Sequence, residues 1–98
     1  MGKAASHFIW CSGQTYRLHY LEWDHHGRLS GIYPLEEEIA GVAFYNGTLV
    51  PILSTDLPGN TMSEKDWQAL ASKVVPGSLI KLYHLEGEMI KKLIVNFF

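Results

Sequence analysis

The sequence predicts a mainly β fold, either a small β-sandwich or an open barrel of about seven strands, with one packed α-helix. Two observations predict it. Runs of β-branched and aromatic residues are separated by short turn signals, and one stretch alone has the period of an amphipathic helix. Hairpins with one apolar face need a second layer to cover that face. The 98 residues fit a single domain over residues 1–98.

The first predicted hairpin joins Tyr16–Trp23 to Arg28–Tyr33 through the polar loop Asp24–Gly27. The glycine that ends this loop is suited to a left-handed backbone conformation. Every second residue from Tyr16 to Tyr20 is aromatic or aliphatic. This period of two predicts a strand with these side chains on one face.

The second predicted hairpin joins Val42–Tyr45 to Thr48–Leu53 through Asn46-Gly47. Asn-Gly between β-forming residues is the strongest short hairpin signal, because a type I′ turn needs positive φ at both central residues.

The third predicted hairpin joins Leu79–Leu85 to Glu88–Phe97 at Glu86-Gly87. The last strand, from Ile90 to Phe98, is apolar on both faces apart from two lysines and an asparagine. A strand of that kind is covered on both sides or lies at a contact with another chain.

The single helix is predicted over Ser63–Val74. Ser63 supplies a capping hydroxyl, and two acidic residues follow in the first turn, where the helix dipole favours negative charge. The apolar stripe that should pack on the sheet consists of Trp67, Leu70, Ala71 and Val74. Pro76-Gly77 ends the helix.

Composition excludes several classes of function. The net charge of −2 and the scattered Lys and Arg residues disfavour nucleic-acid binding. The single cysteine, Cys11, is expected to be a buried, inert thiol in a reducing compartment. No apolar stretch reaches the length of a membrane span, and no signal-peptide pattern occurs, so we expect a cytoplasmic protein without membrane contact.

The candidate reactive residues do not form a known catalytic or metal-binding motif. The five histidines lack ligand spacing, and His25 and His26 are neighbours that point apart on an extended chain. The acidic run Glu36–Glu38 is expected to be solvated. We therefore predict no catalytic residue, no metal site and no cofactor.

Part of the chain resembles a known family. The segments concerned are Leu21–Asp24, Gly27–Ile32 and Phe44–Pro51. Together they resemble the N-terminal segment of the amidohydrolase superfamily, in its cytosine deaminase and chlorohydrolase branch. The resemblance implies the small β domain of that family. Pro76–Ile80 and the last strand look like its C-terminal part.

The resemblance does not extend to the activity of these enzymes. Their first histidine metal ligands would fall on or near Leu57 and Gly59, neither of which binds metal. Their catalytic (β/α)₈ barrel needs about 200 residues or more. The resemblance therefore implies a scaffold without a metal-binding barrel.

Three hypotheses of function follow. The first is a non-catalytic structural or interaction domain, with a protein partner or a second copy of the chain covering exposed apolar strand surface. The second is a small-molecule binding module with an aromatic-lined pocket. Its candidate residues are Trp10, His19, Trp23 and His84. The third, an unrecognised enzyme, has the least support.

Overall fold

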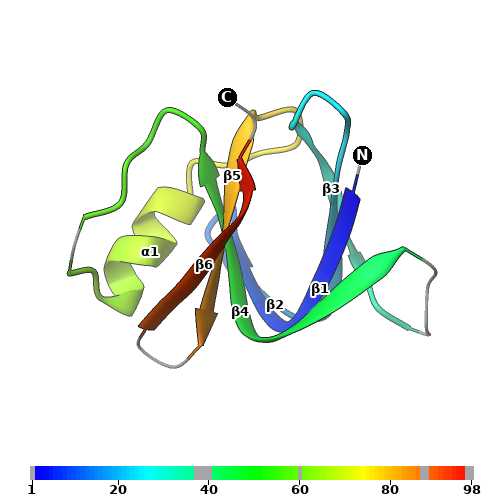
Figure 1. Cartoon of the computed structure of the whole chain (residues 1–98), viewed down its shortest axis with the longest axis horizontal. Helices are drawn as coiled ribbons and strands as arrows, with labels where there is room; N and C mark the ends of the chain where they lie inside the picture. The colour runs from blue at the N-terminus through cyan, green and yellow to red at the C-terminus, as the bar shows by residue number, and fades with distance from the viewer. Residues whose placement is uncertain (1, 37–40, 60, 87–88, 97–98) are drawn as a thin grey trace.

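The computed structural model describes residues 2–36, 41–59, 61–86 and 89–96. Within them it contains six strands and one helix (Figure 1). The elements are β1 (Gly2–Cys11), β2 (Gln14–Trp23), β3 (Leu29–Pro34), β4 (Val42–Leu53), α1 (Glu64–Ala71), β5 (Ile80–Glu86) and β6 (Met89–Asn96).

The strands form one curled sheet in the order β3-β2-β1-β4-β5-β6. Neighbouring strands are antiparallel, except that β1 and β4 are parallel. A bridge between Arg28 and Leu79 links the start of β3 to the residue before β5, so the sheet curls round on itself. A mainly β fold with one helix is thus confirmed. The described residues hold six strands in a single sheet, where we expected about seven, and they do not form a two-sheet sandwich.

Two of the predicted hairpin pairings are present. β2 and β3 are antiparallel neighbours, and the Asp24 carboxylate accepts hydrogen bonds from the backbone N–H groups of His26 and Arg28. β5 and β6 pair from Glu86 and Met89 onward. Gly87 of the third predicted turn lies outside the described residues, as do both ends of the predicted last strand (Glu88, Phe97 and Phe98) and Glu37 and Glu38 of the acidic run.

The hairpin predicted at Asn46-Gly47 is wrong, because β4 continues through these residues as one strand. The pairing with β1 passes from Ser6 and Tyr45 to Phe8 and Thr48, so two residues of β4 face one of β1. Gly47 has φ of +96°. The positive φ that Asn-Gly favours therefore serves a β-bulge inside a strand held between β1 and β5.

A tight turn that we did not predict joins β1 to β2. Ser12 and Gly13 have φ of +54° and +78°, and Cys11 pairs with Gln14. Positive φ at both central residues of a two-residue loop is the type I′ pattern.

The alternation predicted for β2 is also broken, at Leu18. This residue has φ of +53° and is exposed. Tyr16 and Leu21, five residues apart, consequently pack against the same core. Side chains on a regular strand at that spacing would point to opposite faces.

The curled sheet separates two hydrophobic cores. The inner core lies on the concave side and contains Ala4, Ile9, Cys11, Leu21, Leu29, Leu49, Val74, Ile80 and Leu82. The outer core lies between the sheet and α1 and contains Val50, Ile52, Trp67, Ala71 and Leu85. Successive residues of β4 alternate between the two cores, which explains why both of its faces are buried there.

The helix begins as predicted and ends earlier. Ser63 caps it, and the Ser63 hydroxyl and the Asp66 carboxylate each accept a backbone N–H of the other, forming a capping box. The helix ends at Ala71, and Val74 of the predicted stripe packs in the inner core. α1 packs on the outer surface of the sheet at the carboxyl ends of β1 and β4 and on the Tyr83 and Leu85 side chains of β5 (Figure 1).

Candidate functional site

The two predicted pocket tryptophans lie at opposite ends of the β1–β2 hairpin. Trp10 pairs with Thr15 beside the turn, whereas Trp23 pairs with Gly2 at the open end. Eight residues of strand separate Gly2 from Trp10, roughly 25 Å along the chain. Trp23 lies against Gly2, where an added Cβ would come within 2.3 Å of the indole ring. The structure thus places the two indoles in different parts of the molecule.

The two predicted histidines each bond to a nearby backbone carbonyl. His19 Nδ1 lies 2.8 Å from the Arg17 carbonyl oxygen, and its ring is 5.2 Å from that of Tyr16. His84 Nε2 donates to the carbonyl oxygen of Asn46, at the bulge. The four predicted residues are therefore spread over the sheet, and only Trp10 lines a sizeable cavity described below.

An exposed apolar surface lies on the part of the sheet that α1 leaves uncovered. Tyr33, Tyr20, Ala5 and Phe44 stand opposite one another across β3, β2, β1 and β4. Directly paired residues project to the same face of a sheet. The Tyr20 and Tyr33 rings are 5.5 Å apart, and Phe44 makes an edge-on contact of 5.1 Å with His7.

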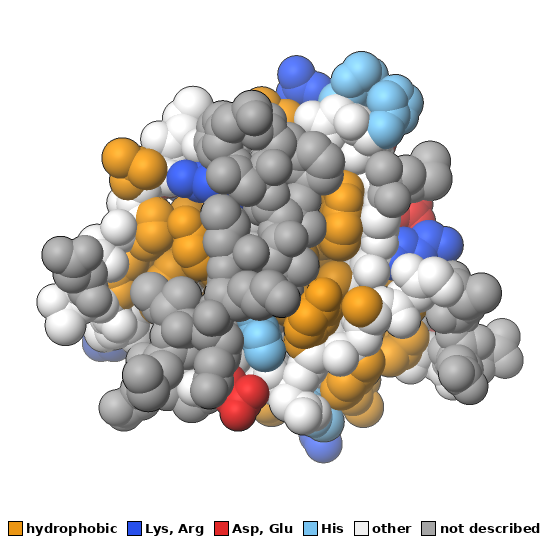
Figure 2. Space-filling model, viewed as in Figure 1, with side chains coloured by type: hydrophobic (Ala, Val, Ile, Leu, Met, Phe, Trp, Pro, Cys, Tyr) orange, Lys and Arg blue, Asp and Glu red, His pale blue; other side chains and the backbone are white. Residues whose placement is uncertain are grey.

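Two further apolar side chains lie near this row, at the bend of β1 and β2. The exposed fractions are 42% for Phe8, 43% for Leu18, 41% for Tyr33 and 47% for Phe44. We call Phe8, Leu18, Tyr20, Tyr33 and Phe44 the outer apolar face. Figure 2 shows hydrophobic side chains gathered at the surface over the region of β1 and the amino-terminal half of β4.

Opposite charges flank the outer apolar face along β2. Arg17 pairs with Phe8, and Glu22 pairs with Lys3, so both charges project to the face that Tyr20 occupies. Lys3 Nζ lies 4.0 Å from a Glu22 carboxylate oxygen. The outer apolar face therefore has a positive charge at one end, from Arg17, and an ion pair of Lys3 and Glu22 at the other end, with aromatic side chains between them.

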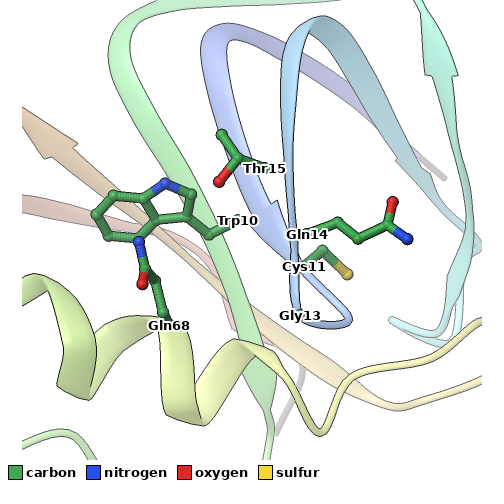
Figure 3. Close-up of a pocket in the computed structure, with 6 residues that line it drawn as sticks. All are labelled: Trp10, Cys11, Gly13, Gln14, Thr15 and Gln68. Carbon is green, nitrogen blue, oxygen red and sulfur yellow. The ribbon is translucent and has the colours of Figure 1, made fainter.

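A cavity of about 410 Å³ lies between the sheet and the start of α1. It is lined by Trp10, Thr61, Met62, Ser63, Glu64, Trp67 and Leu85, and we call it the Trp10–Trp67 groove. Trp10 also lines a smaller cavity of about 100 Å³ with Gln68. Figure 3 shows the Trp10 indole beside Gln68 of α1, while the Cys11 side chain points away from it.

Leu57 and Gly59, the residues at which the resemblance to amidohydrolases would place metal ligands, carry no metal-binding side chain. Leu57 is 84% exposed in the connection after β4, and Gly59 follows it. Across the described ranges, no three His, Cys, Asp or Glu side chains come together to hold an ion. In the same ranges, no helix is long and apolar enough to cross a membrane.

Cys11 is buried, as expected. Its side chain is 1% exposed, and its Sγ lies 3.4 Å from Ser12 Oγ. Burial raises the pKa of the Cys11 thiol, and the Ser12 hydroxyl partly offsets this rise. A thiol of this kind is a poor nucleophile, because the thiolate is the reactive form.

The raised pKa predicts a loss of stability at high pH. The folded protein holds the thiol proton more tightly than the unfolded chain does. The stability that Cys11 contributes is therefore fully present below its ordinary pKa of 9.0 and decreases as the pH rises above that value. We expect the free energy of unfolding, measured by urea titration, to decline more steeply above that pH in the native sequence than in Cys11→Ala. Equal slopes in the two proteins would contradict this prediction.

The outer apolar face does not follow from the sequence patterns. Phe44 was assigned to a separate hairpin strand, and Leu18 to the apolar side of β2. The face could be recognised only from the bulge in β4 and the positive φ of Leu18. No protein-family model, curated protein or solved structure matches the chain.

Proposed function

We propose that this chain is a non-catalytic interaction domain that self-associates through its outer apolar face. The observation that carries the proposal is the row of three aromatic side chains, on β3, β2 and β4, that flanks Ala5 of β1 on a surface that α1 leaves uncovered. Contiguous apolar patches on soluble domains are typical of binding surfaces, whereas scattered apolar residues are ordinary.

A second copy of the chain fits the charges of this face. A two-fold axis that lies in the plane between two facing sheets, perpendicular to β2 and level with Tyr20, would run the two β2 strands antiparallel. Arg17 of each copy would then face Glu22 of the other, while the Tyr20 side chains meet at the axis. The outer apolar face is therefore complementary in charge to the same face of a second copy.

The size of the face predicts a weak dimer. Four strands and the described length of β2 give a surface of roughly 15 Å by 25 Å on each copy. Two such surfaces bury well below about 1,200 Å², which is the low end for specific stable interfaces. We expect a dimer with a dissociation constant of roughly 10 µM.

Sedimentation velocity over a range of concentrations tests the dimer. The native chain should pass from monomer to dimer, and Phe44→Ser should stay monomeric because it removes the most exposed aromatic anchor of the face. Leu57→Ser is the matched control, since Leu57 is exposed outside the face. A native chain that stays monomeric, or a Phe44→Ser variant that dimerises as well as the native chain, would contradict the proposal.

Charge reversal tests the orientation of the two copies. Arg17→Glu and Glu22→Arg should each weaken the dimer by about tenfold, since each places like charges opposite one another. The double variant restores opposite charges across the axis and should recover much of the loss. Additive losses in the double variant would rule out the two-fold arrangement.

The descent of this domain from the small β domain of amidohydrolases belongs to the proposal as well. It is supported by the segments quoted above, and the Asn46-Gly47 motif within them forms a bulge in this chain. The absence of a donor at Leu57 and Gly59 supports the non-catalytic assignment. A metal-loaded preparation that hydrolyses cyclic amides or deaminates nucleobases would overturn it.

Small-molecule binding is the second candidate function. It is favoured by the Trp10–Trp67 groove, whose volume of about 410 Å³ lies within the usual range of ligand sites. A thermal-shift screen against metabolites would test it, with a raised midpoint expected for a compound that binds the folded state.

A further inference from the structure

We infer that the Trp10–Trp67 groove binds a small organic cation with a methylated ammonium group. This inference rests on the second candidate function and is independent of self-association. The groove opens between β1, β5 and the start of α1; Leu85 shares a paired row with Thr48 and Phe8, so the groove borders the outer apolar face at Phe8 but holds none of the Tyr20, Tyr33 and Phe44 rings.

The aromatic lining is the first argument. Trp10 and Trp67 both line the groove, together with Met62 and Leu85. Indole faces attract cations more strongly than other aromatic side chains do, and aromatic walls are the usual means of recognising quaternary ammonium groups. The Tyr83 ring lies 5.2 Å from that of Trp67 and helps to hold the indole in place.

Trp67 forms the rigid back of the groove, and the accessible indole surface is that of Trp10. The Trp67 side chain is only 3% exposed and is part of the outer core, so it is held by packing on most sides. Trp10 is partly buried on a strand paired on both sides. A preformed aromatic wall binds with little loss of side-chain entropy.

The charge of the groove is the second argument. Ser63 and Asp66 satisfy each other in the capping box, whereas Glu64 has no ion-pair partner within the described part of the chain. Glu64, an exposed residue that lines the groove, therefore gives it a negative charge. The helix amino terminus favours anions, but its first turn already holds the carboxylates of Glu64 and Asp66. A cationic ligand is the better match.

Three probes of similar shape and different charge test this inference in the full chain. They are choline, its uncharged isostere in which a tert-butyl group replaces the trimethylammonium group, and the anion pivalate. Binding is followed by tryptophan fluorescence and by amide chemical shifts. Choline should bind with a dissociation constant of roughly 1 mM or tighter, and the other two at least about tenfold more weakly.

Equal binding of choline and its neutral isostere would overturn the cationic assignment while leaving a ligand groove. Preferential binding of pivalate would also overturn it. A failure of all three probes would remove the groove as a site for this chemistry. A short peptide with a trimethylated lysine distinguishes the source of the cation: tighter binding than choline would assign the groove to a protein ligand, and equal or weaker binding to a free metabolite.

Two variants locate the binding site. Glu64→Gln keeps the size of the side chain and should weaken choline binding by about fivefold, because it removes an exposed charge. Trp10→Leu keeps an apolar wall and should weaken it by about tenfold. Glu36→Gln removes an exposed acidic charge that does not line the groove and should leave binding unchanged. Unchanged binding in both groove variants would overturn the inference, and the amide spectrum of each variant confirms that it is folded.

Discussion

Replacing Gly47 with alanine should destabilise the protein by about 3 kcal/mol. Two effects combine at this position. Gly47 has φ of +96°, a region that costs residues with a Cβ roughly 1–2 kcal/mol. An added Cβ would also lie 2.4 Å from the Leu85 carbonyl oxygen, far inside a normal contact. That oxygen belongs to β5, which is paired with strands on both sides and has little room to move.

Gly13→Ala is the matched control for this prediction. Gly13 also has positive φ, +78°, but an added Cβ would meet no atom within 4 Å. At Gly13 an alanine would meet only the cost of the positive backbone φ, so we expect the free energy of unfolding to fall by about 1 kcal/mol. Urea unfolding of the two variants separates the backbone cost from the contact with β5. Equal losses would show that the close approach of β4 and β5 at the bulge adds nothing.

Gly47 also illustrates what the sequence could reveal about the fold. Asn-Gly correctly indicated positive φ at Gly47, although not at Asn46, which a type I′ turn would also require. Whether that φ closes a hairpin or forms a bulge depends on which strand lies alongside. Here β1 pairs in parallel with β4 on both sides of Gly47, and β1 is distant in sequence. Local patterns carry no information about such long-range pairing.

The helix and the first hairpin were predictable because the interactions that form them are local in the sequence. Ser63 and the acidic first turn satisfy the helix end locally, and the loop before Arg28 closes through Asp24 and Gly27. Both signals act within four residues. The candidate pocket failed to form as one cluster because Trp10 and Trp23 were grouped by residue type, and their distance depends on the hairpin turn at Ser12-Gly13.

The second large effect is expected for Trp67→Ala, with a loss of about 4 kcal/mol in the free energy of unfolding. Trp67 is the largest residue of the outer core and is 3% exposed. Its removal would leave a cavity among Val50, Ile52 and Leu85, which the strands cannot close without losing their pairing. Gln68→Ala, one position along on the exposed side of the helix, should change stability by less than about 0.5 kcal/mol.

The loss should appear as global unfolding of the protein, not as detachment of α1 alone. An isolated helix of this length is marginal in water, so α1 depends on packing. Its carboxyl end is nevertheless tied to the sheet: Ser12 N–H donates to the Ala71 carbonyl oxygen, and Val74, just beyond the helix, lies in the inner core. Releasing α1 would therefore expose the inner core. Hydrogen exchange should speed up equally for α1 and for central β4 amides in Trp67→Ala. Faster exchange confined to α1 would show that the helix opens independently of the sheet.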